Sequence, residues 1–233
     1  AMCGRYAIGK LQWWILQETF KLQQAAANLE PRWNIAPTQL APIIRQRTDE
    51  ELGNELAMAR WGLVPHFWHK PLSEMKYSTF NAKAETAADL PSFRHSFRRR
   101  HCIVPAVGFY EWTGEKGAKQ PWFIGLKDTD WFGMAGLWDR AEIEGAVIDS
   151  FTILTIPAND AMKRVHNRMP VMLRPEECQP WLEPQTADIE LILKGAPSET
   201  LWIHAANKAV GNVRTDGEWL TEPGDGPQLT GLV

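Results

Sequence analysis

Four polar residues have side chains that could carry out covalent or proton-transfer chemistry. They are Cys3 in the segment Cys-Gly-Arg-Tyr, Asn81 in Thr-Phe-Asn-Ala-Lys, Glu111 in Gly-Phe-Tyr-Glu-Trp and His166 in Arg-Val-His-Asn-Arg. A cysteine thiol becomes a strong nucleophile when a histidine takes its proton and an amide or carboxylate orients that histidine. These residue types therefore permit a thiol-dependent enzyme, and a cysteine peptidase is one interpretation of them.

Two of the four residues also have a simple structural interpretation. Glu111 falls in a predicted strand, where alternation turns its side chain to the same side as Val107 and Phe109. A carboxylate on an apolar face is unfavourable unless it is paired, so Glu111 is either a functional acid or a buried acid neutralised by an arginine. A single histidine such as His166 is likewise either structural or catalytic.

Common catalytic and cofactor-binding signatures are absent from the sequence. There is no Walker A loop, no Gly-x-Gly-x-x-Gly, no Gly-x-Ser-x-Gly and no Cys-x-x-Cys. His66 and His69 flank an aromatic pair and His101 precedes Cys102, but these spacings do not match a metal site. We therefore predict neither a metal nor a cofactor.

The composition is typical of a globular protein. The chain has 233 residues, 44% of them hydrophobic and 23% charged, which is enough for one sizeable core or at most two small ones. A net charge of −3 excludes a surface coated in basic charge, although a local basic groove stays possible. We expect most of the 12 tryptophans in the core and a few stacked on nucleic-acid bases.

Neither a membrane span nor a signal peptide is recognisable. No apolar run approaches the roughly 20 residues that cross a bilayer, so we expect a cytoplasmic protein without membrane contact. Three cysteines, Cys3, Cys102 and Cys178, are too scattered for a disulfide framework. We interpret Ala1 as a tag remnant and expect removal of Met2 to make Cys3 the mature N-terminus.

The elements that must position these residues are mostly strands. Apolar spacing predicts one early helix, from Lys10 to Phe20. Strands are expected at 40–44, 55–64, 102–112, 121–126, 131–143 and 151–156, with a turn at 113–117. Later helices are expected at 159–164, 175–182 and 186–194, the last stopped by Gly195. Strands that outnumber helices without alternating with them favour an α+β or barrel-like fold.

Seven short sequence segments occur in a fixed order along the chain, and together they are more specific than any one of them. They are Cys-Gly-Arg-Tyr from residue 3, Trp-Asn-Ile-Ala-Pro-Thr from 33, Arg-Trp-Gly-Leu-Val-Pro from 60, Asn-Ala-Lys-Ala-Glu-Thr from 81, Gly-Phe-Tyr-Glu-Trp from 108, His-Asn-Arg-Met-Pro from 166 and Val-Gly-Asn-Val from 210. The series resembles the SRAP family (SOS response-associated peptidase). The resemblance implies one α+β SRAP domain over residues 2–221, with a β-barrel-like core of antiparallel strands flanked by short helices. We expect an extended tail over residues 222–233.

The resemblance also implies a function: sensing abasic sites in single-stranded DNA and forming a covalent DNA–protein crosslink. The α-amine of an N-terminal Cys3 would add to the ring-opened sugar aldehyde, and the thiol would then close a thiazolidine ring. An α-amine has a pKa of about 7.7–8.0, so a useful fraction is neutral near pH 7. Ring closure within one residue benefits from a very high effective molarity.

The remaining residues take supporting roles in this interpretation. Glu111 would shuttle protons, His166 would help the closed sugar to open, and Asn81 would orient the aldehyde or the amine. Arg5 and Arg168 would hold the flanking phosphates.

Further DNA contacts are expected from five residues. Pro37 and Thr155 would line the groove, and the aromatic pair Phe67 and Trp68 would stack on bases unless it forms a packed hydrophobic turn. Lys83 stands where many family members have arginine, which keeps the charge but loses the bidentate fork. The arginine run at 98–100 is either a solvated face or the edge of the groove.

Alternative functions stay open at this point. The family name reflects a thiol autopeptidase, in which Cys3 would be the nucleophile. A non-catalytic reader of modified DNA would bind without needing Cys3. An abasic-site lyase side reaction through the same Schiff base is chemically possible. If Ala1 and Met2 are retained, the nitrogen of Cys3 is an amide and no thiazolidine can form. A monomer suffices for the crosslinking chemistry.

Overall fold

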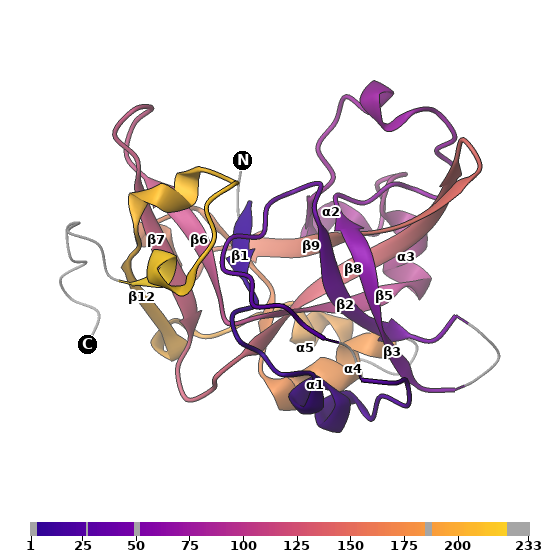
Figure 1. Ribbon diagram of the computed structural model, residues 1–233, viewed down its shortest axis with the longest axis horizontal. Helices are drawn as coiled ribbons and strands as arrows, with labels where there is room; N and C mark the ends of the chain where they lie inside the picture. Colours follow the sequence, from indigo (N-terminus) through magenta and orange to yellow (C-terminus); the bar gives the residue numbers. More distant parts are fainter. Residues whose placement is uncertain (1–3, 27, 49–51, 185–187, 223–233) are drawn as a thin grey trace.

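The computed structural model describes residues 4–26, 28–48, 52–184 and 188–222 (Figure 1). Its strands are β1 (Arg5–Ala7), β2 (Leu40–Gln46), β3 (Asn54–Trp61), β4 (Asn81–Lys83), β5 (His101–Ala106), β6 (Gly108–Thr113), β7 (Gln120–Leu126), β8 (Phe132–Ile143), β9 (Ala146–Pro157), β10 (Arg168–Pro170), β11 (Met172–Leu173) and β12 (Leu201–Ala205). Its α-helices are α1 (Trp13–Phe20), α2 (Ala84–Ala87), α3 (Arg94–Arg99), α4 (Cys178–Leu182) and α5 (Ile189–Ile192), joined by short 3-10 turns. Cys3 lies outside the described residues, as does all of the predicted tail except Glu222.

Five strands close into a barrel. The order β9–β3–β2–β5–β8 returns to β9 because β8 also pairs with β9. Four of these pairings are antiparallel, whereas β3 and β9 run parallel. β4 and β10 extend the barrel by pairing with β9, and β11 pairs with β8. The predicted α+β fold with a barrel-like core and short helices is confirmed.

A second sheet, in the order β1–β6–β7–β12, lies beside the barrel (Figure 1). The apolar run at 102–112, predicted as one strand, is therefore two strands in two different sheets. The break falls at Val107, whose N–H donates to the carbonyl of Ala7 in β1 at 2.8 Å. A change of sheet within an unbroken apolar run leaves no mark in the pattern of hydrophobicity, because both strands are buried on both faces.

Aromatic packing joins the two sheets. Trp61 at the end of β3 is fully buried and meets Tyr6 of β1 edge to face, with ring centroids 5.1 Å apart. Phe80, just before β4, meets the same indole edge-on at 5.8 Å. β1 and β4 are thus brought to one aromatic centre, as expected for tryptophans that serve mainly as core.

The helices are shorter than the sequence predicts. α1 begins at Trp13 rather than Lys10, because Ile8 and Gly9 donate their N–H groups to the carbonyl of Arg32. The region 175–182 divides into a 3-10 turn and α4, and 159–164 forms only the 3-10 turn Met162–Arg164. Gly195, with φ of 69°, follows α5 as expected. Within the described residues no helix is long and apolar enough to cross a membrane.

Candidate functional site

The end of β9 brings several predicted site residues together. Asn81 opens β4 opposite Ile153 of β9, and Lys83 closes β4 opposite Thr155. On the other edge of β9, Thr155 also faces Pro170 of β10. Thr155 is fully buried and donates its hydroxyl to the carbonyl of Ala82 at 3.4 Å, whereas Lys83 is exposed. β4 and β10 therefore present their side chains around one short stretch of β9.

Arg168, at the start of β10, already has a carboxylate partner. Its two terminal nitrogens contact the two carboxylate oxygens of Glu85 in α2, one of them at 2.7 Å. The same side chain donates to the carbonyl of Thr155 at 2.6 Å. Hydrogen bonding from Arg168 holds the pKa of Glu85 below its usual value, against a smaller effect of burial, and the charge of Lys83 adds to the lowering. The guanidinium fork is thus occupied within the protein, whereas Lys83 is exposed to solvent.

The hydrogen bond to His166 favours one tautomer of its ring. Its ring Nδ1 accepts the backbone N–H of Arg168 at 3.1 Å, and the backbone N–H of His166 donates to the carbonyl of Met162 at 2.9 Å. When Nδ1 is an acceptor, the neutral imidazole carries its proton on Nε2. The half-buried ring can therefore act as a hydrogen-bond donor through Nε2.

Glu111 lies in β6 with only 3% of its surface exposed, which agrees with the expectation of a buried acid. It faces Trp122 in β7, and its Oε1 accepts the N–H of Trp112 at 3.3 Å. On the opposite edge of β6, Arg5 of β1 pairs with Tyr110, so the antiparallel register carries Gly4 towards Glu111.

Gly4 also lies near Asn81. A Cβ built on Gly4 would be 3.8 Å from the ring of Phe80, the residue before Asn81. Since β1 joins the second sheet to the aromatic centre of the barrel, Gly4 lies between the region of Glu111 and the region of Asn81. Gly4, the first described residue, therefore lies between two of the predicted catalytic residues. Cys3, the residue before it, lies outside the described residues.

Arg5 is held by a buried hydrogen-bond network centred on Asn34, a residue that the sequence did not predict as part of the site. Its Nη1 donates to the Oδ1 of Asn34 at 2.9 Å and to the carbonyl of Val210 at 2.5 Å. Asn34, 3% exposed, donates to the carbonyls of Val210, Asn212 and Thr215. Burial lowers the pKa of Arg5. The segments that begin at residues 3, 33 and 210 are thus joined by structural hydrogen bonds.

The aromatic pair divides into one exposed ring and one packed ring. Phe67 is 46% exposed, whereas Trp68 is half-buried against a small apolar cluster and meets Tyr77 edge-on at 6.1 Å. The loop is anchored by His66, whose N–H and Nδ1 both lie near the Oδ2 of the buried Asp139, at 2.9 and 3.1 Å. Phe67 is therefore the ring of this pair with a large solvent-facing surface.

The arginine run on α3 divides in the same way. Arg98 and Arg99 are exposed. Arg100 contacts the carboxylate of Asp139 and lies over the ring of Trp138, 5.0 Å from its centroid. One of the three arginines is therefore structural and the other two face solvent.

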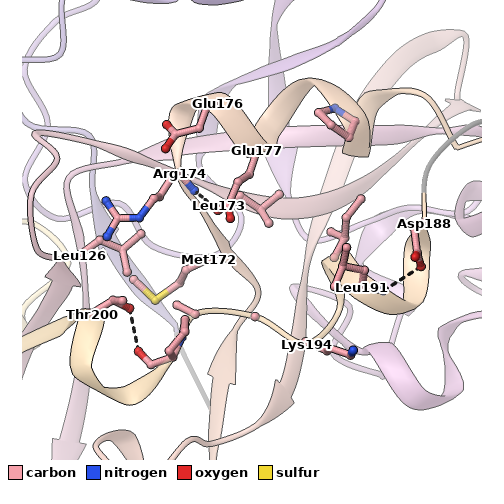
Figure 2. A pocket seen from close by; sticks show the side chains of 15 residues that line it. Leu126, Met172, Leu173, Arg174, Glu176, Glu177, Asp188, Leu191, Lys194 and Thr200 are labelled. Atoms are coloured by element: carbon pink, nitrogen blue, oxygen red, sulfur yellow. Dashed lines mark hydrogen bonds between the residues drawn. The ribbon is translucent and has the colours of Figure 1, made fainter.

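Two cavities differ in their relation to these residues. Pro37 lines a cavity of about 200 Å³ together with Thr38, Arg60 and Phe80. A cavity of about 500 Å³ lies elsewhere, between β11 and α5, and its lining includes Leu126, Met172, Leu173, Arg174, Leu191 and Lys194 (Figure 2). Of the predicted site residues that the structure describes, none lines this larger cavity.

Known proteins match nearly the whole chain. Residues 2–213 match the model of a family described as SOS response associated peptidase (SRAP). The abasic site processing protein YoqW of Bacillus subtilis is 32% identical over 229 residues, covering 95% of this chain and 99% of that protein. YedK of Escherichia coli, also named an abasic site processing protein, is 30% identical over 231 residues, covering 95% and 100%.

Solved structures match the fold. A crystal structure of a protein from Bacteroides thetaiotaomicron superimposes with a TM-score of 0.79 at 24% identity, covering 95% of this chain and 100% of that one. A crystal structure from Bordetella bronchiseptica gives a TM-score of 0.70 at 29% identity, covering 88% and 100%.

Proposed function

Because this chain belongs to the SRAP family, as its sequence motifs predict, we propose that it processes abasic sites in DNA by forming a covalent crosslink through Cys3. The names of its relatives support abasic-site processing as the general role. The observation that carries the finer proposal is the position of Gly4 between the regions of Glu111 and Asn81. Gly4 lies near a buried acid and a neutral amide, and Cys3 precedes Gly4 in the sequence.

The proposed reaction requires a free α-amine on Cys3. The amine nitrogen adds to the C1′ aldehyde of the ring-opened sugar, and the resulting carbinolamine loses water to give an imine. The thiol sulfur then adds to the imine carbon, while its proton is transferred to the nitrogen. The product is a thiazolidine, and one water molecule is released in total.

The geometry supports a separate role for each polar residue. Glu111 is buried in β6, where a carboxyl group can move protons between the amine, the carbinolamine and the thiol. The Nε2–H of His166 can donate to the ring oxygen of the sugar as the closed form opens. Asn81 can orient the aldehyde without adding charge. Lys83 and Phe67, both exposed, are available to a phosphate and to an unstacked base.

A denaturing gel of protein with single-stranded DNA that contains one abasic site tests this proposal. The samples are chain beginning at Cys3, chain beginning at Ala1, and the Cys3-start chain with Cys3→Ala. We expect a heat-stable shifted band with the first sample alone, because the other two lack the amine or the thiol. Absence of the band in all three would contradict the crosslinking function.

Two alternatives are tested by the same samples. An abasic-site lyase needs only the imine, so Cys3→Ala with a free α-amine should cleave the DNA strand by β-elimination without a stable adduct. A cysteine peptidase would cleave an unrelated peptide in a Cys3-dependent way, and DNA would not be required. We infer single-stranded DNA as the preferred form because base stacking on Phe67 needs an unpaired base.

A further inference from the structure

Two neighbouring cavities form a groove that leads away from the candidate site along the outside of the barrel. The cavity beside Pro37 and a second cavity, of about 410 Å³, share the lining residues Thr38 and Arg60. The first cavity also reaches Phe80, the residue before Asn81. The groove therefore begins at the candidate site and passes Arg60.

Arg60 in β3 has no carboxylate partner among the described residues. Its Nη1 donates to the carbonyl of Gly62 at 2.6 Å, and that carbonyl is neutral. The guanidinium is half-buried, and desolvation by burial lowers the pKa of Arg60. Arginine nevertheless keeps its charge in proteins, so a partly desolvated positive charge lies at the junction of the two cavities.

The nearest acidic lining residue is neutralised by other arginines. Asp149 lines the second cavity, but it accepts hydrogen bonds from Arg45 at 2.9 Å and from Arg140 at 2.7 Å. Burial raises the pKa of Asp149, and the hydrogen bonds and charges of Arg140 and Arg45 outweigh it, so the pKa is held below its usual value. The charge of Arg60 is therefore left to attract an anion.

The backbone beside Arg60 is arranged around its guanidinium. Gly62 has a φ of 124°, a conformation that favours glycine, and an added Cβ would lie 2.7 Å from the Nη1 of Arg60, so the guanidinium would have to shift. Across the groove, Thr38 has a φ of 76°, a conformation that β-branched residues rarely adopt. Strained backbone persists where the surrounding structure fixes it, often at binding sites. This arrangement explains the Arg-Trp-Gly part of a sequence segment that the predicted site leaves without a role.

An exposed apolar wall lies next to the charge. Leu40, directly opposite Arg60 in the β2–β3 pair, is 58% exposed. Met58 and Val147, which line the same cavity, are 51% and 65% exposed. A single cation beside apolar side chains matches a nucleotide, which has a charged phosphate and a sugar and base with apolar faces.

We propose that this groove, lined by Pro37, Thr38, Leu40, Met58, Arg60 and Val147 and called here the Arg60 groove, binds a nucleotide of the DNA strand that flanks the lesion. Arg60 contacts its backbone phosphate, and the apolar wall contacts its sugar and base. The inference rests on the proposed function in taking DNA as the partner, but it does not depend on the crosslink.

Binding of undamaged single-stranded DNA, measured by fluorescence anisotropy over a range of salt concentrations, tests the Arg60 groove. We expect Arg60→Gln to raise Kd about five- to tenfold near 0.1 M salt. The slope of log K against log salt should also fall by about 0.7, the value for one phosphate contact on a single strand. Arg174→Gln, in the cavity of Figure 2, is the control and should bind like the wild type.

A second pair of variants covers the case in which Arg60→Gln lowers the stability of the fold. Leu40→Glu places a negative charge at the groove on a side chain that is 58% exposed, and Leu191→Glu makes the same change at equal exposure beside the other cavity. If Leu40→Glu weakens DNA binding and the control Leu191→Glu does not, the result supports the proposed groove. Wild-type Kd and salt slope in both Arg60→Gln and Leu40→Glu would overturn it, as would a wild-type protein that binds no single-stranded DNA. DNA binding that depends on Arg60 without any crosslink on abasic DNA would contradict the proposed reaction and leave the groove standing.

Discussion

At the scale of single residues, the predicted site divides into side chains that face solvent and side chains already bonded within the protein. Lys83 and Phe67 are exposed, whereas Arg168 is bound to Glu85, and Arg5 to Asn34. The sequence indicates that these arginines are important but not what they contact, because their partners lie 83 and 29 positions away along the chain. Pairings between such distant residues depend on where β10 and β1 lie in the tertiary structure, and a local sequence pattern does not predict that position.

The Arg168–Glu85 pair leads to a prediction about DNA affinity. Glu85 is the anion nearest a predicted phosphate-binding arginine, so replacing it by a neutral isostere frees the guanidinium and removes a repulsive charge. We expect Glu85→Gln to lower Kd for single-stranded DNA on the order of threefold. Glu176→Gln, beside the cavity of Figure 2, is the matched control for loss of one negative charge. Equal affinity of Glu85→Gln and wild type would mean that the pair is structural only.

At the scale of elements, the position of Glu111 depends on how β6 packs. The sequence correctly predicts that Glu111 lies in a strand and is buried. It does not predict that the chain changes sheets at Val107. Directly after this change of sheet, the ring of Phe123 in β7 packs on the backbone of Gly108, the first residue of β6.

The packing of β6 against β7 should not tolerate one extra methyl group. A Cβ on Gly108 would lie 2.3 Å from the ring of Phe123, which is itself only 5% exposed and cannot move aside. We expect Gly108→Ala to lower the free energy of unfolding by about 1–3 kcal/mol in urea denaturation. Gly211→Ala, where nothing lies within 4 Å of the added Cβ, should unfold like the wild type. An unchanged midpoint for Gly108→Ala would show that the two strands pack less closely than described.

At the scale of the whole molecule, four barrel strands are tied together by one network of charges. Arg45 of β2 is 4% exposed and lies 4.1 Å from the ring centroid of Trp138. It contacts Glu55 of β3 and Asp149 of β9, and Asp149 also binds Arg140 of β8. The five barrel strands and a barrel-like core were predictable from the sequence. The parallel β3–β9 pair and this charge network were not, because they join distant segments.

The network predicts a pH-dependent contribution to stability. Replacing Asp149 by Asn leaves the buried Arg45 with Glu55 as its ion-pair partner and removes the ion pair of the partly exposed Arg140, so Asp149→Asn should cost about 2 kcal/mol at pH 7. The pKa of Asp149 is lowered in the folded protein, so its contribution is present above the unfolded pKa of about 3.9 and is lost as pH falls through the folded value. Urea denaturation at pH 7 and near pH 3 should show the difference between variant and wild type shrinking at the lower pH. Asp160→Asn, on an exposed carboxylate, serves as the control; a pH-independent difference would contradict the role of the Asp149 charge.

Mass spectrometry of the DNA adduct, after protease digestion and treatment with a thiol-alkylating reagent, tests directly whether Cys3 forms a thiazolidine. A thiazolidine on Cys3 blocks both the amine and the sulfur, so we expect a Cys3 peptide joined to the DNA with loss of one water and no alkyl group. Cys102 and Cys178, both buried and free, should be alkylated once the protein is denatured and report that the reagent worked. An adduct on a lysine such as Lys83, or an adduct on Cys3 whose thiol is still alkylated, would contradict the thiazolidine reaction.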